Sequence, residues 1–232
     1  MNIWRLIESP PSDIFSQMAA DWELFEGFLQ NPQKPPLLRI YRVTEPAVTV
    51  GRFYRFYGTF YGTISKSAGF KAFDNLNLEL LEMVPSQVCV RPTGGGLVEH
   101  GRDLIYSVIA RRDSFPTFHQ VRTSYLSFHE AVQEALQKLG IETRLFRCDE
   151  AKRKKGRGVP SPCFSEPVAT DVLANERKIA GGAQRRKGEA FLHQGSVQLP
   201  QGISFEILKE ALVNAFEKKF RIVWSEKIAE AV

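Results

Sequence analysis

The chain has 232 residues, of which 43% are hydrophobic and 11% aromatic, and its formal net charge is +5. These totals allow one sizeable core and exclude a fibrous or wholly disordered protein. The three cysteines have no paired spacing, so neither a disulfide framework nor a metal site is expected. No stretch approaches the ~20 apolar residues that span a bilayer. The N-terminus also lacks the features of a secretory signal, so we expect a cytoplasmic protein without a membrane partner.

Residues 13–31 predict the first element, an amphipathic helix capped by Ser12 or Asp13. Its expected apolar stripe is Ile14, Met18, Trp22, Phe25 and Leu29. The β-rich segments 36–43 and 46–53 then predict two strands.

Residues 54–70 are rich in Tyr, Phe and Gly and have no clear period, so we interpret them as an inserted loop or hairpin. Residues 76–84 predict a short helix. Two apolar strands are expected at 86–92 and 103–112, and a glycine-rich segment separates them.

The second half of the chain also predicts a series of helices and strands. A helix with Tyr125 and Leu139 on its apolar face should end at Gly140. A strand at 142–146 and a polar loop at 149–162 are expected to follow.

Residues 171–186 predict a hairpin that turns at Asn175 and Glu176. A strand at 191–199 and a last helix capped by Ser204 complete the pattern. We therefore expect one domain over residues 1–232, of the α/β class, with a mixed, largely antiparallel sheet and packed helices.

Three consecutive glycines, Gly94, Gly95 and Gly96, fit neither the GxxxxGK[ST] nor the GxGxxG phosphate loop. One interpretation is a glycine-rich hairpin. The other is that missing side chains let a ligand lie against the backbone. Further small residues near Lys178 and His193 favour the second interpretation, because they indicate a groove shared by three strands.

Three segments, RPTGGGLVEHGRDLIYSV, DVLANERKIAGGAQRR and FLHQGSV, resemble in order and spacing the lipoate–protein ligase and octanoyltransferase family. That family attaches lipoyl or octanoyl groups to one lysine of small carrier domains. The resemblance covers about residues 88–199. It implies a mixed sheet like that of biotin–protein ligases, with the acyl chain in a tunnel beside the glycines. Pro92 stands where the family commonly has a second arginine, which leaves the role of that arginine open.

The resemblance also implies site residues. Those expected to bind substrate are Arg91, Thr93, Gly94, Gly95, Gly96, His100, Asp171, Gly181, Gly182 and His193. Lys178 should contact the acyl carbonyl and stabilise the charge that develops on it. His100 is either catalytic or a support of the glycine turn, and His193 is expected to be structural. His129 is expected in the core.

The family holds two chemistries. A transferase passes the acyl group through a cysteine and needs no cofactor, whereas a ligase uses ATP and magnesium. Cys163, fifteen residues before Lys178, matches the transferase nucleophile and favours that branch. Nearby cations could lower its pKa toward neutrality. Asp171 matches an aspartate that ligases carry near the nucleotide, so the ligase stays open. Cys89 and Cys148 are expected to be inert.

The resemblance implies acyl carrier protein as octanoyl donor and a lipoyl domain or glycine cleavage H protein as acceptor. Basic runs at 151–157 and 176–187 would attract an acidic carrier, although a solvated loop explains the first run equally well. Nucleic acid is not expected, because no RNA-binding aromatic motif or zinc-finger spacing accompanies these runs. Whether octanoyl or lipoyl is preferred stays open. A non-catalytic module that binds a carrier is a further alternative, against which the retention of all three segments argues.

Overall fold

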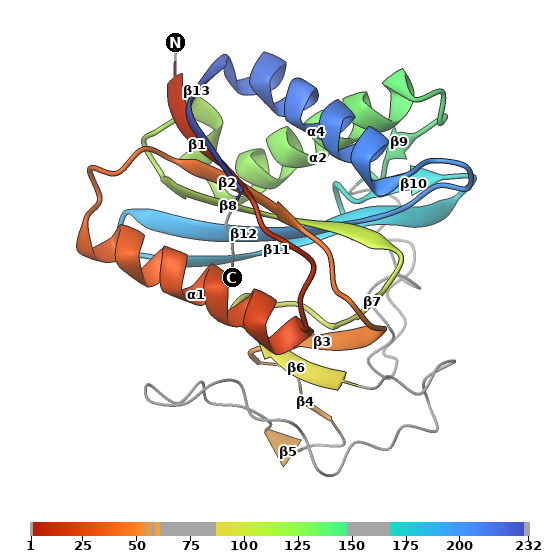
Figure 1. The fold of residues 1–232 in the computed structure, drawn as a ribbon, viewed down its shortest axis with the longest axis horizontal. Coiled ribbons are helices and arrows are strands. Elements are labelled where there is room, and N and C mark those ends of the chain that lie inside the picture. The colour runs from red at the N-terminus through yellow and green to blue at the C-terminus, as the bar shows by residue number, and fades with distance from the viewer. Residues whose placement is uncertain (1, 54, 57–58, 61–86, 148–167, 230–232) are drawn as a thin grey trace.

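The computed structural model describes residues 2–53, 55–56, 59–60, 87–147 and 168–229 (Figure 1). Several predictions fall outside these residues: the helix at 76–84, most of the insertion at 54–70, the basic run at 151–157, Cys148 and Cys163.

The strands are β1 (Asn2–Glu8), β2 (Leu37–Tyr41), β3 (Ala47–Gly51), β4 (Arg55–Phe56), β5 (Thr59–Phe60), β6 (Gln87–Arg91), β7 (Leu97–His100), β8 (Asp103–Arg111), β9 (Arg144–Leu145), β10 (Val172–Ala174), β11 (Arg177–Lys187), β12 (Ala190–Gln198) and β13 (Ile222–Ala229). The helices are α1 (Ile14–Gln30), α2 (Val121–Lys138) and α4 (Phe205–Phe220), with a 3₁₀ turn, η2 (Pro116–Phe118).

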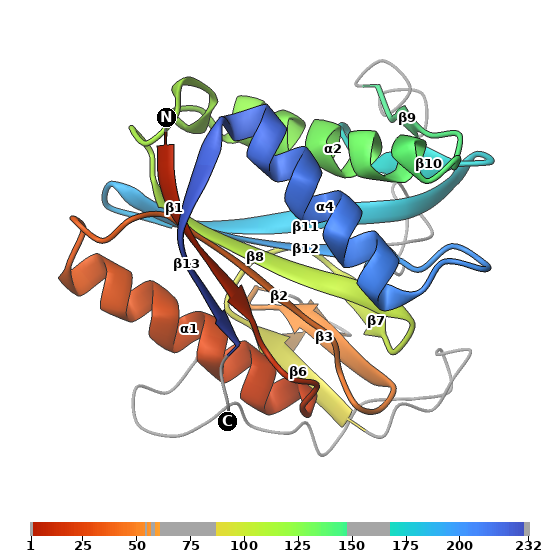
Figure 2. The same ribbon diagram turned by 45° about the horizontal axis from the view of Figure 1, so that its top comes forward.

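An eight-stranded sheet in the order β13-β1-β2-β8-β12-β11-β10-β9 forms the centre of the molecule. Only β1 pairs in parallel with its neighbours β13 and β2, and every other pair is antiparallel. Helices α2 and α4 lie on one face of this sheet and α1 on the other (Figure 2). The expected α/β class with a mixed, largely antiparallel sheet is therefore confirmed.

Strands β1 and β13, which pair with each other, were not predicted. Asn2 lies beside Ile222, and the pairing continues to Glu8 and Ala229. Both segments are short and mix polar with apolar residues, so periodicity alone does not identify them as strands. Long-range pairing at the sheet edge decides their structure.

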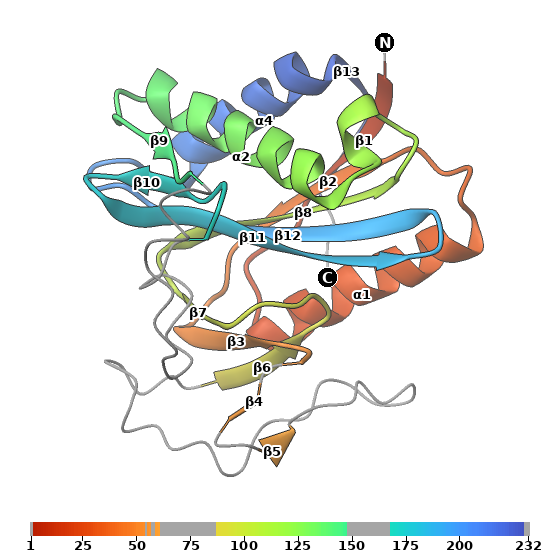
Figure 3. The ribbon, with the colours of Figure 1, turned by 180° about the vertical axis from the view of Figure 1, so that it is seen from behind.

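A second sheet of three strands, in the order β6-β3-β7, lies beside α1 (Figure 3). Both β6 and β7 pair with β3, the first in parallel and the second antiparallel. Residues 91–97 therefore cross from one side of β3 to the other. The interpretation of the glycines as a hairpin is wrong, because the strands that they join are not neighbours. The predicted strands at 36–43 and 46–53 likewise belong to different sheets.

The predicted helix ends and the predicted turn are confirmed. Asp13 caps α1 by accepting hydrogen bonds from the backbone N–H groups of the first turn. Ser204 caps α4 by accepting from the Ile207 N–H. Asn175 and Glu176 both have positive φ, 48° and 61°, as a two-residue hairpin turn of the I′ type requires.

The main core fills the space between the large sheet and helices α2 and α4, and its largest members are aromatic. They are Trp4, Tyr106, Phe118, Phe128, Phe191, Phe216 and Phe220. Phe118 is in contact with most of the others, at ring-centroid distances of 5.1–6.2 Å. No helix among the described residues combines the length and apolar character needed to cross a bilayer.

Candidate functional site

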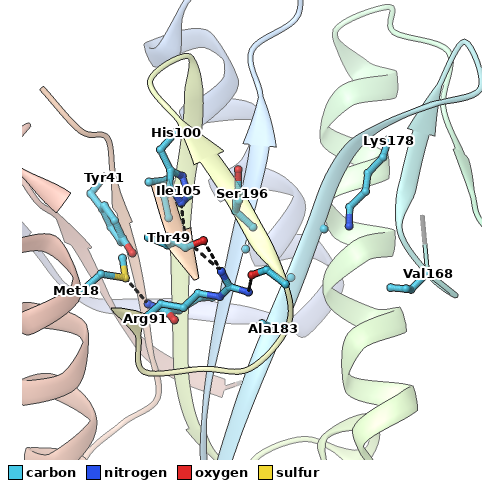
Figure 4. A pocket seen from close by; sticks show the side chains of 17 residues that line it. Met18, Tyr41, Thr49, Arg91, His100, Ile105, Val168, Lys178, Ala183 and Ser196 are labelled. Carbon is cyan, nitrogen blue, oxygen red and sulfur yellow. Dashed lines mark hydrogen bonds between the residues drawn. The ribbon is translucent and has the colours of Figure 1, made fainter. Parts of the chain in front are cut away.

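A cavity of about 180 Å³ opens between the two sheets on the α1 side (Figure 4). Its lining is Met18, Tyr41, Thr49, Arg91, Gly95, Gly96, Val98, His100, Ile105, Val168, Lys178, Gly181, Gly182, Ala183, Gln194, Gly195 and Ser196. An apolar cavity of ~150 Å³ holds benzene, so this one has room for a short apolar chain. The three segments that carried the family resemblance all contribute to its wall.

Lys178 reaches this cavity because of an irregularity in β11. Leu173 lies opposite Lys178, whereas the preceding Val172 lies opposite Ala180. Ile179 is therefore an extra residue on β11, a β-bulge. A bulge reverses the alternation of side chains, so Lys178 points to the same face as Gly181. Figure 4 shows the side chain running along the strand toward the cavity.

The ammonium group of Lys178 is held by a buried carboxylate. Its Nζ lies 2.8 Å from Asp171 Oδ2, and the two side chains are only 7% and 1% exposed. The same oxygen accepts a hydrogen bond from the Val168 N–H at 2.7 Å. A Cβ on Gly181 would lie 2.5 Å from Lys178 Cε, so this glycine makes room for the lysine. A fixed cation thus lies in the cavity wall.

The turn before Asp171 is strained and anchored by a histidine. Thr170 has φ +81°, which a β-branched residue rarely adopts. Its carbonyl accepts a hydrogen bond of 2.7 Å from His129 Nδ1, and its N–H donates to the Phe146 carbonyl at 2.9 Å. Burial, offset in part by Asp171, lowers the pKa of His129. The expected core position of His129 is confirmed, and the residue also fixes the turn that places Asp171.

The glycine segment is folded around the guanidinium of Arg91. This group donates to the carbonyls of Gly94 (2.6 Å) and Gly96 (2.8 Å), and to the Thr49 carbonyl at 3.1 Å. Gly95 has φ +89°, and a Cβ there would lie 2.7 Å from Arg91 Nη2. Arg91 therefore lines the cavity itself and also shapes its wall by fixing the loop backbone.

Gly51, at the end of β3, supports this loop and was not predicted. A Cβ on Gly51 would lie 2.2 Å from the Gly95 carbonyl oxygen and 2.6 Å from the Gly94 carbonyl carbon. Its N–H also donates to the Gly96 carbonyl at 3.3 Å. In contrast, a Cβ on Gly94 would meet nothing within 4 Å. Of these glycines, Gly94 is thus the one whose missing side chain leaves open space.

His100 uses both ring nitrogens within the protein. Nδ1 lies 2.7 Å from Asp103 Oδ2, and Nε2 lies 2.9 Å from Thr49 Oγ1. The Ser196 hydroxyl donates to the same Asp103 oxygen at 2.6 Å. Burial alone would raise the pKa of Asp103, but His100 and this hydroxyl outweigh it and lower the pKa. Of the two expected roles for His100, the geometry supports ordering the glycine segment.

The floor of the cavity is a buried polar network that sequence reasoning missed. Asp21 of α1 is 0% exposed. Its Oδ2 accepts hydrogen bonds of 2.6–2.7 Å from Tyr41, Ser107 and Gln194, and its Oδ1 is paired with Arg39 at 2.8 Å. Thr93 joins this network by donating to Gln194 Oε1 at 2.7 Å. Thr93 is therefore connected to the cavity wall through Gln194.

His193 does not line the cavity, in contrast to its place among the expected substrate-binding residues. Successive side chains of a strand point to opposite faces, so His193 lies on the α2 face while Gln194 faces the cavity. The ring is 4.6 Å from that of Phe128, and Gly182 makes room for it. Burial, and then His129, lower its pKa well below the usual value. The expected structural role of His193 is thus supported.

A second hollow of about 400 Å³ adjoins the first. It shares Gly95, Val168, Gly182 and Ala183 with the first cavity and adds Gly94, Arg122, Tyr125, Ala169, Thr170 and Asp171. The Lys178–Asp171 pair thus lies between the two spaces.

Among the described residues Cys89 is a free cysteine, and it is fully buried in β6. Burial raises the pKa of its thiol far above the usual value. Cys89 is therefore inert, as expected. The candidate nucleophile Cys163 lies outside the described residues.

A family model matches residues 69–227, more than half of the chain, and its description is the lipoyl protein ligase A/B catalytic domain. The chain belongs to this family. The motif segments that predicted it, from Arg91 to Gly195, all lie within the matched range.

Curated relatives in the family include an octanoyltransferase LipM of Oceanobacillus iheyensis, 28% identical over 200 residues. Another octanoyltransferase LipM, of Moorella thermoacetica, is 30% identical over 198 residues. The matches cover 86% and 84% of this chain but 65% of each relative. The chain therefore matches less than two thirds of the length of these relatives.

Solved structures share the fold. A lipoate–protein ligase A bound with ATP is 22% identical with a TM-score of 0.69, and the match covers 99% of this chain and 90% of that one. A putative lipoate protein ligase of T. acidophilum with bound lipoic acid is 21% identical with a TM-score of 0.68, covering 99% and 91%. The lipoyl protein ligase A/B fold is thus shown by structure as well as by sequence.

Proposed function

We propose that this protein is an octanoyltransferase that moves an octanoyl group from acyl carrier protein to a specific lysine of a lipoyl domain or of glycine cleavage H protein. The observation that carries the proposal is the buried ion pair of Lys178 and Asp171, 2.8 Å apart, in the wall of an apolar cavity. Such a cavity accepts an acyl chain and places its carbonyl beside a fixed cation. The octanoyltransferase relatives support the transfer reaction.

The reaction has two steps. The Cys163 thiolate attacks the carbonyl carbon of the donor thioester, the new C–S bond forms, and the donor sulfur leaves and takes up a proton. The neutral amine of the acceptor lysine then attacks the acyl-enzyme, the amide bond forms, and the Cys163 sulfur leaves as the proton of the amine is released. Lys178 stabilises the negative charge that develops on the carbonyl oxygen in both steps.

No cofactor is needed on this route, because the donor is already an activated thioester. The expected ATP and magnesium belong to the ligase alternative. Asp171 is paired with Lys178 and accepts the Val168 N–H. The aspartate that suggested a nucleotide site thus has a role in holding the lysine.

Intact-protein mass spectrometry tests the proposal. Wild-type protein is mixed with octanoyl-acyl carrier protein without ATP, in parallel with Cys163→Ala and Cys148→Ala. We expect one octanoyl adduct on wild type and on Cys148→Ala, and none on Cys163→Ala. Acylation of a lipoyl domain that requires free octanoate and ATP, and is unaffected by Cys163→Ala, would identify a ligase instead.

A further inference from the structure

Two arginines near the cavity wall, Arg185 and Arg52, form no ion pair with an acidic side chain in the part of the chain that the structure describes. Arg185 Nη1 is buried and has no hydrogen-bond partner. Its guanidinium carbon lies 4.1 Å from the Trp22 ring centroid, so the planar group is held by stacking. Among the described residues Arg185 forms no ion pair. The negative charge of Glu26 on α1 raises the pKa of Arg185 without a direct contact. A buried N–H without a partner is costly, so it indicates a missing acceptor.

The second arginine is Arg52, which follows β3 directly. Its backbone N–H donates to the Thr93 carbonyl at 2.9 Å, so Arg52 is fixed to the glycine segment. Its guanidinium lies 4.5 Å from the ring centroid of Phe53, a side chain that is 62% exposed. Burial and then repulsion from Arg52 lower the pKa of Arg185 to about 10. Both arginines are also connected to the same part of the cavity wall: Thr93, which accepts from Arg52, donates to Gln194, and Gln194 pairs with Ala183, two residues before Arg185. Two like charges at one wall favour a bound anion.

The position of Arg185 relates this pair to the cavity. Gly181, Ala183 and Arg185 alternate onto one face of β11. Gly181 lies against the Lys178 ammonium, and Ala183 lies against the glycine segment, 3.9 Å from the position of a Gly95 Cβ. Four residues of strand span about 13 Å. Arg185 is therefore about that far from the place where the acyl carbonyl is expected.

We propose that Arg185 and Arg52 bind a phosphate group, and that its source is the phosphodiester of the phosphopantetheine arm that carries the acyl thioester. This proposal rests on the proposed function and names how the donor is recognised. The arm has about 14 bonds between sulfur and phosphorus, so it extends over about 15 Å, at the ~3.4 Å per three bonds of an extended chain. That length matches the ~13 Å of strand between Arg185 and Gly181, the residue that lies against the Lys178 ammonium.

The other phosphate that this family could bind is that of an acyl-adenylate. Its phosphorus is joined to the acyl group through a single oxygen, so it would stay beside Lys178. Arg185 lies too far along the strand for it. The carrier arm is thus the source that the geometry favours.

The test compares kcat/KM for octanoyl-phosphopantetheine and octanoyl-pantetheine, which differ only in the phosphate. Charge-assisted hydrogen bonds to the phosphate should make wild type prefer the first donor by about 10- to 100-fold. Arg185→Gln and, separately, Arg52→Gln should reduce this preference and leave turnover of octanoyl-pantetheine unchanged. Lys187→Gln removes the same charge from an exposed position of β11 and should keep the preference. An unchanged preference in Arg185→Gln and Arg52→Gln would overturn the proposal.

Calorimetry with non-transferable analogues separates this proposal from the transfer reaction. An ether analogue of octanoyl-phosphopantetheine should bind Arg185→Gln about 10-fold or more weakly than wild type. A sulfamoyl analogue of octanoyl-adenylate should bind both proteins alike. If the adenylate analogue instead shows the loss, the assignment to the carrier arm is wrong. If Arg185→Gln weakens binding of the ether analogue but wild type turns over no octanoyl thioester, the phosphate site is supported and the proposed function is wrong.

Discussion

The two faces of the large sheet differ in what they bury. The face under α2 and α4 buries aromatic rings, with Phe118 and Phe128 at the centre. The face toward α1 also buries apolar side chains, such as Phe25 and Phe28, but it adds charged and hydrogen-bonded groups, such as Asp21 with Arg39, and leaves a cavity. The same strands serve both faces, because their side chains alternate. The difference teaches that one face supplies stability while the other positions groups for chemistry, and the following substitutions test this division.

Phe128→Ala should produce the largest loss of stability, because it removes a fully buried ring at the centre of the aromatic cluster. We expect the free energy of unfolding to fall by about 3–5 kcal/mol, measured by urea denaturation. The rate of acyl transfer per folded molecule at low temperature should stay unchanged. A large loss of activity in protein that is still folded would contradict the division.

Lys178→Met should have the largest effect on activity. Loss of the cation that faces the acyl carbonyl should lower the rate by about 10²–10³-fold, or ~2.7–4 kcal/mol of barrier, in single-turnover assays. It also leaves the Asp171 carboxylate buried without its partner, which destabilises the protein. The double variant Lys178→Met, Asp171→Asn is the control. It should recover stability and stay inactive, and recovery of activity would show that Lys178 acts only through folding.

Gly51→Ala and Gly94→Ala form a matched pair in the glycine segment. A methyl group on Gly51 meets the backbone of Gly94 and Gly95 at 2.2–2.8 Å, which no side-chain movement can relieve. We expect a loss of about 1–3 kcal/mol of stability from overpacking, seen as a lower urea midpoint. Gly94→Ala should keep the wild-type midpoint. If Gly94→Ala slows transfer at constant stability, the acyl donor lies against this backbone.

The smallest expected effect is a pH dependence of stability, which comes from two buried histidines on the α2 side of the sheet. The pKa values of His129 and His193 are lowered by burial, so the unfolded state binds more protons below the ordinary pKa of 6.5. The free energy of unfolding should therefore decrease as the pH falls below about 6.5, by up to about 1.4 kcal/mol per pH unit for each histidine. His193→Gln should reduce this slope in urea titrations between pH 5 and 8. An unchanged slope would mean that His193 does not contribute.

Sequence patterns predicted most of the elements. The family resemblance predicted part of the cavity wall, namely Arg91, Gly95, Gly96, His100, Lys178, Gly181 and Gly182. Sequence patterns failed where distant contacts decide. Trp22, expected on the apolar stripe of α1, packs partly buried against the core, but the fully buried residue at that turn is Asp21. A carboxylate on an apolar stripe was the available signal, and its partners Arg39 and Gln194 come from other strands. The inward position of Lys178 depends on a β-bulge, which local sequence does not specify.

The glycines show the same limit in another way. We expected the missing side chains of these glycines to leave room for a ligand against the backbone. Gly181, Gly182 and Gly195 instead accommodate the protein's own side chains: Lys178, His193 and Tyr106. Sequence spacing identified the right positions, but only the packing around each position shows what its missing side chain makes room for.

The pairing of β1 with β13 has a consequence for how this chain folds. Asn2 lies beside Ile222, so the sheet closes only when residues some 220 positions apart meet. Closing a loop of that length costs on the order of 5 kcal/mol in chain entropy. During synthesis, β1 must wait until residues 222–229 have emerged before its partner strand exists. We therefore expect β1–β13 pairing to be the last step in the assembly of the large sheet.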